Sequence, residues 1–127
     1  MNPPLRLEFS RRRRIGRSSD FARLKEEGRR EICGSLIMNW LPAKELRLGV
    51  VTSRKVGSAV VRSRARRLLR EVFRQHQHEV TEPVSMVLVA RQSITRSGLE
   101  SVRRDYLRAL ARARLRKDPP TEPPPQS

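Results

Sequence analysis

The sequence predicts a small α+β domain, in which amphipathic helices pack against a sheet. Three observations predict this class. Residues 60–74 and 99–113 carry apolar side chains at helical spacing, residues 32–41, 46–52 and 84–90 have the composition of strands, and polar connections separate these segments. A chain of 127 residues is long enough for one such domain and too short for two.

The N-terminal part is expected to form a flexible basic arm followed by a short helix. Residues 1–17 are polar, contain a run of four arginines and show no apolar period, so they are predicted to be mobile. The next segment, SSDFARLKEEG, predicts a helix that Ser18 or Ser19 caps and Gly28 ends.

Strand-like segments lie on both sides of the connection PAKE. ICGSLIMNWL, residues 32–41, and LRLGVVT, residues 46–52, are expected to pair as a hairpin. VSMVLVA, at residues 84–90, is largely apolar and predicts a buried strand. The single cysteine, Cys33, lies in the first run and is interpreted as a small core residue. One cysteine permits no internal disulfide, which fits a reducing compartment.

The stretch VVRSRARRLLREVFR, residues 60–74, separates into two faces when it is wound as a helix at about 100° per residue. One arc is apolar and predicts contact with the core: Val61, Ala65, Leu68, Leu69, Val72 and Phe73. Arginine fills most of the rest: Arg62, Arg64, Arg66, Arg67, Arg70 and Arg74. Glu71 is the only acid among them, whereas a face that served only solubility would balance its charges better. This cationic face therefore predicts contact with an anion.

The composition of the whole chain indicates which anion. The formal net charge is +16, from 29 basic and 13 acidic residues, and such a charge repels itself unless a polyanion is bound. Of the basic residues 25 are arginine, whose guanidinium pairs with phosphate through two hydrogen bonds and stacks on bases. Nucleic acid is therefore favoured over a membrane. No apolar run approaches the roughly 20 residues of a membrane span, so a cytoplasmic protein is expected.

The C-terminal part predicts a helix and a tail. Ser97 and Glu100 have the spacing of a capping box that would open the helix. The apolar stripe of this helix comprises Leu99, Val102, Tyr106, Ala109, Leu110 and Ala113. From Asp118 onward, DPPTEPPPQS has too little apolar surface to fold, so residues 118–127 are expected to be disordered.

The residues that protein enzymes use for hydrolysis are scattered in this chain. A nuclease that uses two metal ions needs clustered carboxylates, and the acids here are dispersed, most of them near arginines. No Ser/His/Asp or Cys/His set is evident. His76 and His78 are interpreted as solvated loop residues. We therefore expect no catalytic residue and no metal ligand in the chain itself.

One segment carries a specific resemblance. SRKVGSAVVRSRARRLLREVF, residues 53–73, closely resembles the signature of the bacterial ribonuclease P protein component, where a basic turn and a glycine lead into a helix bearing Arg-Asn-Arg, Lys-Arg and Arg-Glu. The matching residues here are Arg54-Lys55, Arg62-Ser63-Arg64, Arg66-Arg67 and Arg70-Glu71. Similar segments are DFARLKEEG, LRLGVVTS and VLVAR, which ends at Arg91, so the resemblance covers most of residues 5–116.

The resemblance implies a fold and an activity. The fold would be a small α/β sandwich at residues 18–117, with a central four-stranded sheet packed against helices and a left-handed βαβ crossover. The catalyst in this family is an RNA, which holds magnesium ions and hydrolyses precursor tRNA to form the mature 5′ end. The protein would be inactive alone and would act as a monomer in a complex of one protein and one RNA.

The resemblance also implies two sets of binding residues. Those expected to contact the catalytic RNA are Arg62, Ser63, Arg64, Arg66, Arg67 and Arg70. Those expected to bind the 5′ leader of precursor tRNA, in a cleft between the sheet and the first helix, are Phe21, Lys25, Asn39, Arg54, Lys55 and Arg91. The chain departs from the family at three of these positions, because Ser63 replaces an asparagine, Lys25 an aromatic residue and Asn39 a tyrosine.

Two other functions fit the charge. A structural RNA-binding module like a ribosomal protein would explain the size, the charge and the tails, but not the ordered match in residues 53–73. A DNA-binding module with the arginine helix in a major groove would need polar side chains that read bases, and this face offers almost only arginine.

Overall fold

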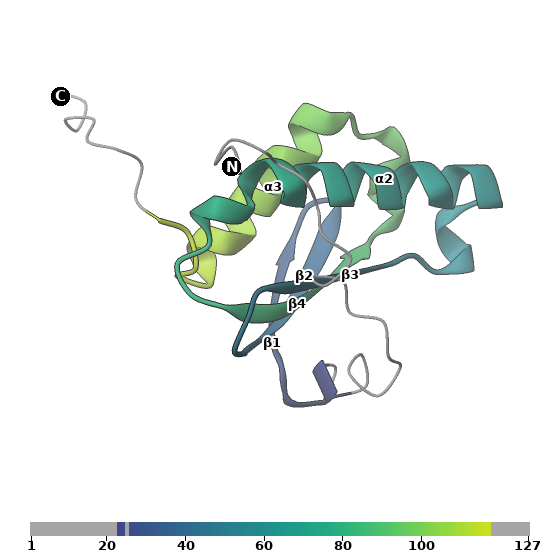
Figure 1. The fold of residues 1–127 in the computed structure, drawn as a ribbon. Coiled ribbons are helices and arrows are strands. Elements are labelled where there is room, and N and C mark those ends of the chain that lie inside the picture. The colour runs from purple at the N-terminus through teal and green to yellow at the C-terminus, as the bar shows by residue number, and fades with distance from the viewer. Residues whose placement is uncertain (1–22, 25, 118–127) are drawn as a thin grey trace, which may run out of the picture.

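A four-stranded mixed sheet with two long helices on one of its faces forms the centre of the structure (Figure 1). The computed structural model describes residues 23, 24 and 26–117. The strands are β1 (Arg29–Cys33), β2 (Leu36–Pro42), β3 (Arg47–Val51) and β4 (Val84–Ala90), and the long helices are α2 (Ala59–His76) and α3 (Leu99–Arg112). The order across the sheet is β1-β2-β4-β3. The predicted α+β class is confirmed.

The predicted hairpin between residues 32–41 and 46–52 is wrong. The first run is broken at Gly34, whose φ of 53° reverses the chain, and its two halves pair with each other as antiparallel β1 and β2. β3 instead pairs in parallel with β4, and α2 is the crossover between them. The physical reason is that β4 is almost wholly apolar and occupies the buried centre of the sheet, between β2 and β3.

The core lies between the sheet and the two helices. Its largest fully buried side chains are Leu36, Met38, Leu48, Leu69, Phe73, Met86, Leu88, Ile94, Tyr106, Leu110 and Leu115. The predicted apolar arc of α2 therefore faces the sheet, and β4 spans residues 84–90 as predicted. Cys33 is buried, as expected of a small core residue. Burial raises the pKa of Tyr106, whose hydroxyl lies 3.7 Å from Met86 Sδ.

The predicted capping box of the last helix is wrong. The N-cap of α3 is Gly98, and no side chain caps the helix. The Ser97 hydroxyl donates instead to the Ser93 carbonyl oxygen (3.1 Å), while Glu100 pairs with Arg103 in the first turn. The short 3₁₀ helix η4 (Gln92–Arg96) explains this difference, because it places Ser97 over its own last turn.

The turn between β1 and β2 is fixed to α3 by a carboxylate. Asp105 Oδ2 accepts hydrogen bonds from the Ser35 amide (2.8 Å) and from the Ser35 hydroxyl (2.7 Å). A Cβ atom on Gly34 would collide with that carboxylate. The turn therefore requires glycine for two reasons, the positive φ and the close approach of Asp105.

We expect Gly34→Ala to lower the free energy of unfolding by about 2–4 kcal/mol, because it strains the backbone and displaces the Asp105 carboxylate. Urea denaturation measures the change. Gly98→Ala is the matched control, since a Cβ atom there would meet nothing within 4 Å. It should cost about 1 kcal/mol or less, as a change of N-cap residue. Equal losses in the two variants would contradict this account of Gly34.

Candidate nucleic-acid interface

Three predicted site residues gather at one edge of the sheet. β3 and β4 are parallel, so both end at this edge. Arg54 and Lys55 follow β3 in the 3₁₀ helix η2 (Arg54–Val56), and Arg91 follows β4. All three side chains are exposed. The resemblance placed them in one site, and the structure brings them to one edge of the sheet.

The chain enters the arginine helix through a tight turn at the same edge. Gly57 has a φ of 155°, and a Cβ atom there would lie 2.9 Å from the Val61 side chain. Ser58 is the N-cap of α2, and its hydroxyl accepts a hydrogen bond from the Val61 amide (3.3 Å). Gly57 and Ser58 therefore position the start of α2 beside Arg54 and Lys55.

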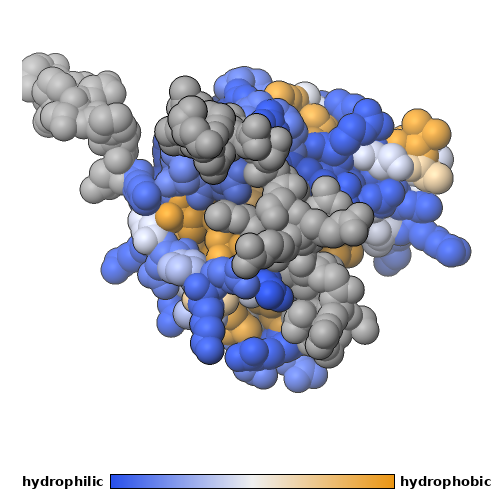
Figure 2. Space-filling model, in the orientation of Figure 1, coloured by the Kyte–Doolittle hydropathy of each residue, from blue (hydrophilic) through white to orange (hydrophobic). Residues whose placement is uncertain are grey.

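Arginines in the first turns of α2 are oriented by neutral acceptors. Arg62 Nη1 donates to the Gly57 carbonyl oxygen (3.2 Å), and Arg64 Nη2 donates to the Ser97 carbonyl oxygen (2.8 Å). Hydrogen bonds of this kind hold a guanidinium in place without cancelling its charge. Arg67 is exposed on the same helix, and Figure 2 shows hydrophilic residues along α2.

Ser63, which stands where the resemblance places an asparagine, accepts a hydrogen bond from a neighbouring arginine. Arg66 Nη2 donates to the Ser63 hydroxyl (3.3 Å), and Arg66 Nη1 donates to the Thr52 hydroxyl (3.0 Å) at the end of β3. Ser63 and Thr52 therefore hold Arg66 across the junction between strand and helix. Thr52 was missed in the sequence, because a hydroxyl at a strand end carries no signal until the fold brings α2 beside it.

In the C-terminal half of α2, unlike the N-terminal half, an acid pairs with an arginine of the same helix. Arg74 Nη2 lies 2.5 Å from Glu71 Oε2, and Gln75 donates to the same oxygen (2.7 Å). The hydrogen bond from Arg74 lowers the pKa of Glu71, although partial burial acts in the opposite direction. The first turn of α2 contains no acid, although the helix dipole favours anions there. The uncompensated charge is therefore concentrated in the N-terminal half, where it would strengthen phosphate binding.

The interpretation of His76 as a solvated loop residue is wrong. His76 is the last residue of α2, its side chain is only 17% exposed, and its Nδ1 lies 2.5 Å from Glu79 Oε2. Burial raises the pKa of Glu79, but His76 and Arg116 outweigh it, so the pKa is lowered overall. Glu79 thus joins the end of α2 to the C-terminal segment. His78, by contrast, is exposed as predicted.

The sheet face that the long helices leave uncovered holds a cavity of about 350 Å³. Asn39 lies on this face, whereas its neighbour Trp40 is buried in the core, because successive side chains of a strand point to opposite faces. The walls of this cavity, termed here the Asn39 pocket, comprise Leu24, Arg30, Ile37, Asn39, Val51, Val87 and Val89. They combine apolar surface with one cation and one amide.

A short helical turn packs over the same face. Leu24 is 3% exposed and contacts Val87 of β4. The Gly28 amide donates to the Leu24 carbonyl oxygen (2.9 Å), and a Cβ atom on Gly28 would collide with that oxygen, so Gly28 ends the helix as predicted. Phe21 and Lys25, which the resemblance predicts to bind the leader, and the two predicted caps, Ser18 and Ser19, lie outside the described residues.

Arg91 lies at the edge where β3 and β4 end. This edge, termed here the rim, separates the arginines of α2 from the open face of the sheet. Arg91 Nη1 donates to the Gly34 carbonyl oxygen (3.1 Å), and the Arg91 amide donates to the Ser35 carbonyl oxygen (2.9 Å). Both acceptors are neutral, so the guanidinium is oriented while its charge stays available. The turn that Asp105 fixes therefore also positions Arg91.

The described residues meet the requirements of neither a metal site nor a membrane span. Within residues 23, 24 and 26–117, no three His, Cys, Asp or Glu side chains gather closely enough to hold a metal ion. In the same part of the chain, no helix combines the length and the apolar character needed to cross a membrane.

Comparison with known proteins identifies the family of this arrangement. The family described as Ribonuclease P matches residues 9–114. The chain is 32% identical over 110 residues to the ribonuclease P protein component of Syntrophomonas wolfei, covering 84% of this chain and 92% of that protein. It is 37% identical over 105 residues to that of Desulfovibrio desulfuricans, covering 80% and 77%.

Solved structures agree. The ribonuclease P protein of Thermotoga maritima superposes with a TM-score of 0.71 at 26% identity, covering 78% of this chain and 96% of that one. The protein of Staphylococcus aureus shares the fold with a TM-score of 0.75 at 24% identity, covering 83% and 98%. The family match, the relatives and the fold agree over most of the chain, which therefore belongs to the family of ribonuclease P protein components.

Proposed function

We propose that this chain is the protein subunit of a ribonuclease P ribonucleoprotein, where it binds the catalytic RNA and the 5′ leader of precursor tRNA. One observation carries the proposal: the N-terminal half of α2, where Arg62, Arg64 and Arg66 bond to neutral acceptors, and the pocketed face of the sheet meet at a single edge. A structural RNA-binding module like a ribosomal protein would need the basic surface alone. It would not need the pocketed face, and the family match does not favour it.

The catalytic RNA binds the N-terminal half of α2 and the turn that follows it in this proposal. The contacting residues are Arg62, Ser63, Arg64, Arg66, Arg67 and Arg70. Support comes from the neutral acceptors that orient Arg62, Arg64 and Arg66 without cancelling their charge. A helix N-terminus adds its own attraction for phosphate.

The leader of precursor tRNA binds along the rim and the open face of the sheet. Arg54, Lys55 and Arg91 would hold leader phosphates, and the Asn39 pocket would receive a base beside Ile37 and Val87. Phe21 and Lys25 are assigned to the same site on the resemblance alone. Because the described walls of the pocket contain no aromatic side chain that could stack on a base, the phosphate contacts should carry much of the affinity.

The chemistry belongs to the RNA partner. Hydrolysis of a phosphodiester by two metal ions needs a set of oxygen ligands that this chain does not gather in its described residues. We therefore assign the magnesium ions to the RNA. The subunit would act as a monomer in a complex of one protein and one RNA, in the cytoplasm.

The leader proposal predicts a selective loss of affinity. In the reconstituted holoenzyme, changing both Arg54 and Lys55 to alanine should weaken binding of precursor tRNA by about tenfold and leave binding of mature tRNA unchanged. If each residue neutralises one leader phosphate, the salt slope of precursor binding should also shallow by roughly 0.7 per residue. Both affinities are measured across a series of salt concentrations.

Changing Arg104 and Arg108 to alanine supplies the matched control. Both are exposed on α3, outside the predicted binding residues, and their removal lowers the net charge by the same amount. The control should leave both affinities nearly unchanged. If precursor and mature tRNA lost affinity equally in the Arg54 and Lys55 variant, the rim would not be a leader site.

A further inference from the structure

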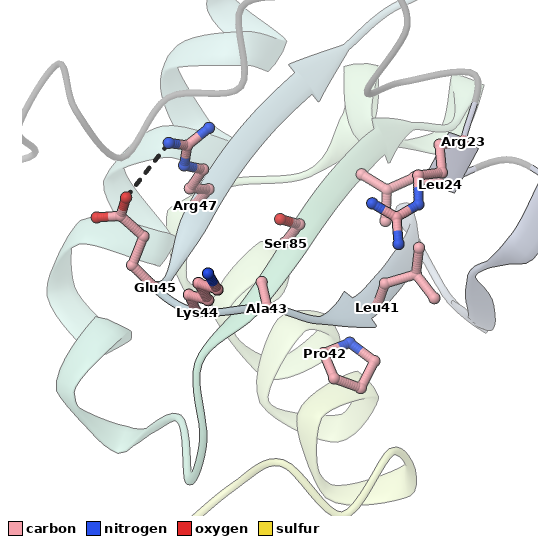
Figure 3. Close-up of a pocket in the computed structure, with 9 residues that line it drawn as sticks. All are labelled: Arg23, Leu24, Leu41, Pro42, Ala43, Lys44, Glu45, Arg47 and Ser85. Atoms are coloured by element: carbon pink, nitrogen blue, oxygen red, sulfur yellow. Dashed lines mark hydrogen bonds and ion pairs between the residues drawn. The ribbon is translucent and has the colours of Figure 1, made fainter.

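A second cavity opens on the uncovered face of the sheet, beyond Leu24. Its volume is about 460 Å³, and it lies where the connection between β2 and β3 passes the start of β4 (Figure 3). This distal pocket is formed mainly by Arg23, Leu24, Leu41, Lys44, Arg47 and Ser85. The resemblance assigned none of its cations, and the sequence shows no motif there.

The distal pocket continues the Asn39 pocket. Leu24 lines both cavities, so they adjoin at its side chain. Ser85 of the distal pocket and Val87 of the Asn39 pocket are neighbours on one face of β4, so they are about 7 Å apart along the strand. An extended polymer lying on this face would pass from one cavity to the other across Leu24.

The chemistry of the distal pocket suits a nucleotide. Arg23, Lys44 and Arg47 contribute three cations around apolar surface from Leu24 and Leu41, and Glu45 contributes one carboxylate. Figure 3 shows Lys44 and Arg47 on one side of the cavity and Arg23 with Leu24 on the other. A volume of this size lies within the roughly 300–1,000 Å³ of ligand pockets.

The ion pairs of these cations leave them able to bind phosphate. Arg47 Nη2 lies 3.3 Å from Glu45 Oε2, and Arg23 Nε lies 3.4 Å from Glu27 Oε1. All four side chains are at least 41% exposed, and ion pairs on such a surface are weak. A phosphate can therefore replace the carboxylates.

We propose that the distal pocket binds the leader of precursor tRNA upstream of the nucleotide in the Asn39 pocket. This inference rests on the proposed function of the open face. Arg54, Lys55 and the basic half of α2 lie where β3 and β4 end, whereas Ser85 lies where β4 begins. The distal pocket is therefore the part of the face farther from the catalytic RNA, and only longer leaders reach it. Because its cations would hold phosphate and its leucines offer no hydrogen bond to a base, the binding would tolerate different bases.

The test uses precursor tRNAs whose leaders lengthen one nucleotide at a time. In wild-type holoenzyme, affinity should rise in two steps, the first for the Asn39 pocket and the second for the distal pocket. Changing Lys44 and Arg47 to alanine should abolish the second step, a loss of about fivefold to tenfold, and leave short leaders unaffected. The salt slope for long leaders should shallow by roughly 0.7 for each phosphate that the variant no longer neutralises.

Lys44→Ala alone is the second variant, because Lys44 is exposed in a loop and its loss should not disturb β3. It should remove part of the second step, while the double change of Arg104 and Arg108 should remove none. If both pocket variants kept the second step, the proposal that the distal pocket binds the leader would be wrong, whereas the proposed leader site at the rim would still stand. Equal losses at every leader length would also overturn it. If wild type showed no preference for a leader, the proposed function of the whole face would fail.

Discussion

The isolated protein should not cleave precursor tRNA, and addition of the cognate catalytic RNA with magnesium should restore cleavage at the mature 5′ end. The effect should be all or none, because the described part of the chain lacks a group of ligands for a metal ion. Three of the described acids have structural roles instead. Glu71 and Glu79 form ion pairs, and Asp105 fixes a turn.

A 5′-labelled precursor separates the outcomes on a gel. Protein alone, RNA alone and the mixture are compared at equal magnesium concentration, with protein freed of copurifying RNA by nuclease and high salt. Cleavage at the mature 5′ end by RNA-free protein would mean that the protein carries the chemistry. Restoration by an unrelated structured RNA would instead contradict the specific partnership.

Changing both Arg64 and Arg67 to alanine should weaken association with the catalytic RNA by about 10-fold to 100-fold at low salt, because the variant cannot form two charge-assisted hydrogen bonds to phosphate. If each arginine neutralises one phosphate, the salt slope should shallow by about one unit or slightly less per residue. Both side chains are exposed, so the melting temperature should change little.

Titration of labelled RNA at several salt concentrations gives both quantities. The double change of Arg104 and Arg108 on α3 again removes the same charge from another helix and should leave the slope nearly unaltered. A loss of affinity with an unchanged slope would show that Arg64 and Arg67 act through packing or non-ionic contacts. The same loss in the control would show that only net charge matters.

The sequence alone determined the features that depend on local pattern. The two faces of α2 follow from helical spacing between Val61 and Phe73, and the span of β4 follows from a largely apolar run. The end of the first helix at Gly28 and the burial of Trp40 opposite Asn39 are also local consequences of glycine and of strand alternation. The signature in residues 53–73 identified the family because it combines several such local features.

Strand pairing and the caps of the last helix were decided by tertiary structure. β3 could have paired with β2 across a short connection, but β4 took the central position and paired with both. The chain reverses at Gly34 because Asp105, 70 residues away from Ser35 in sequence, closes the turn. Ser97 could have capped α3, yet it bonds back to Ser93. In each case two local solutions were available, and long-range contacts selected one.

The finer structure of the interface was also decided by the fold. Thr52 and Ser63 meet Arg66 only because α2 returns over the end of β3. The distal pocket joins Arg23 from a helical turn, Lys44 from a loop and Ser85 from a strand. These residues are distant in sequence and share no pattern, so their proximity depends on how the sheet is assembled. Local patterns in a sequence predict individual elements, whereas a site formed by several elements exists only once those elements have packed.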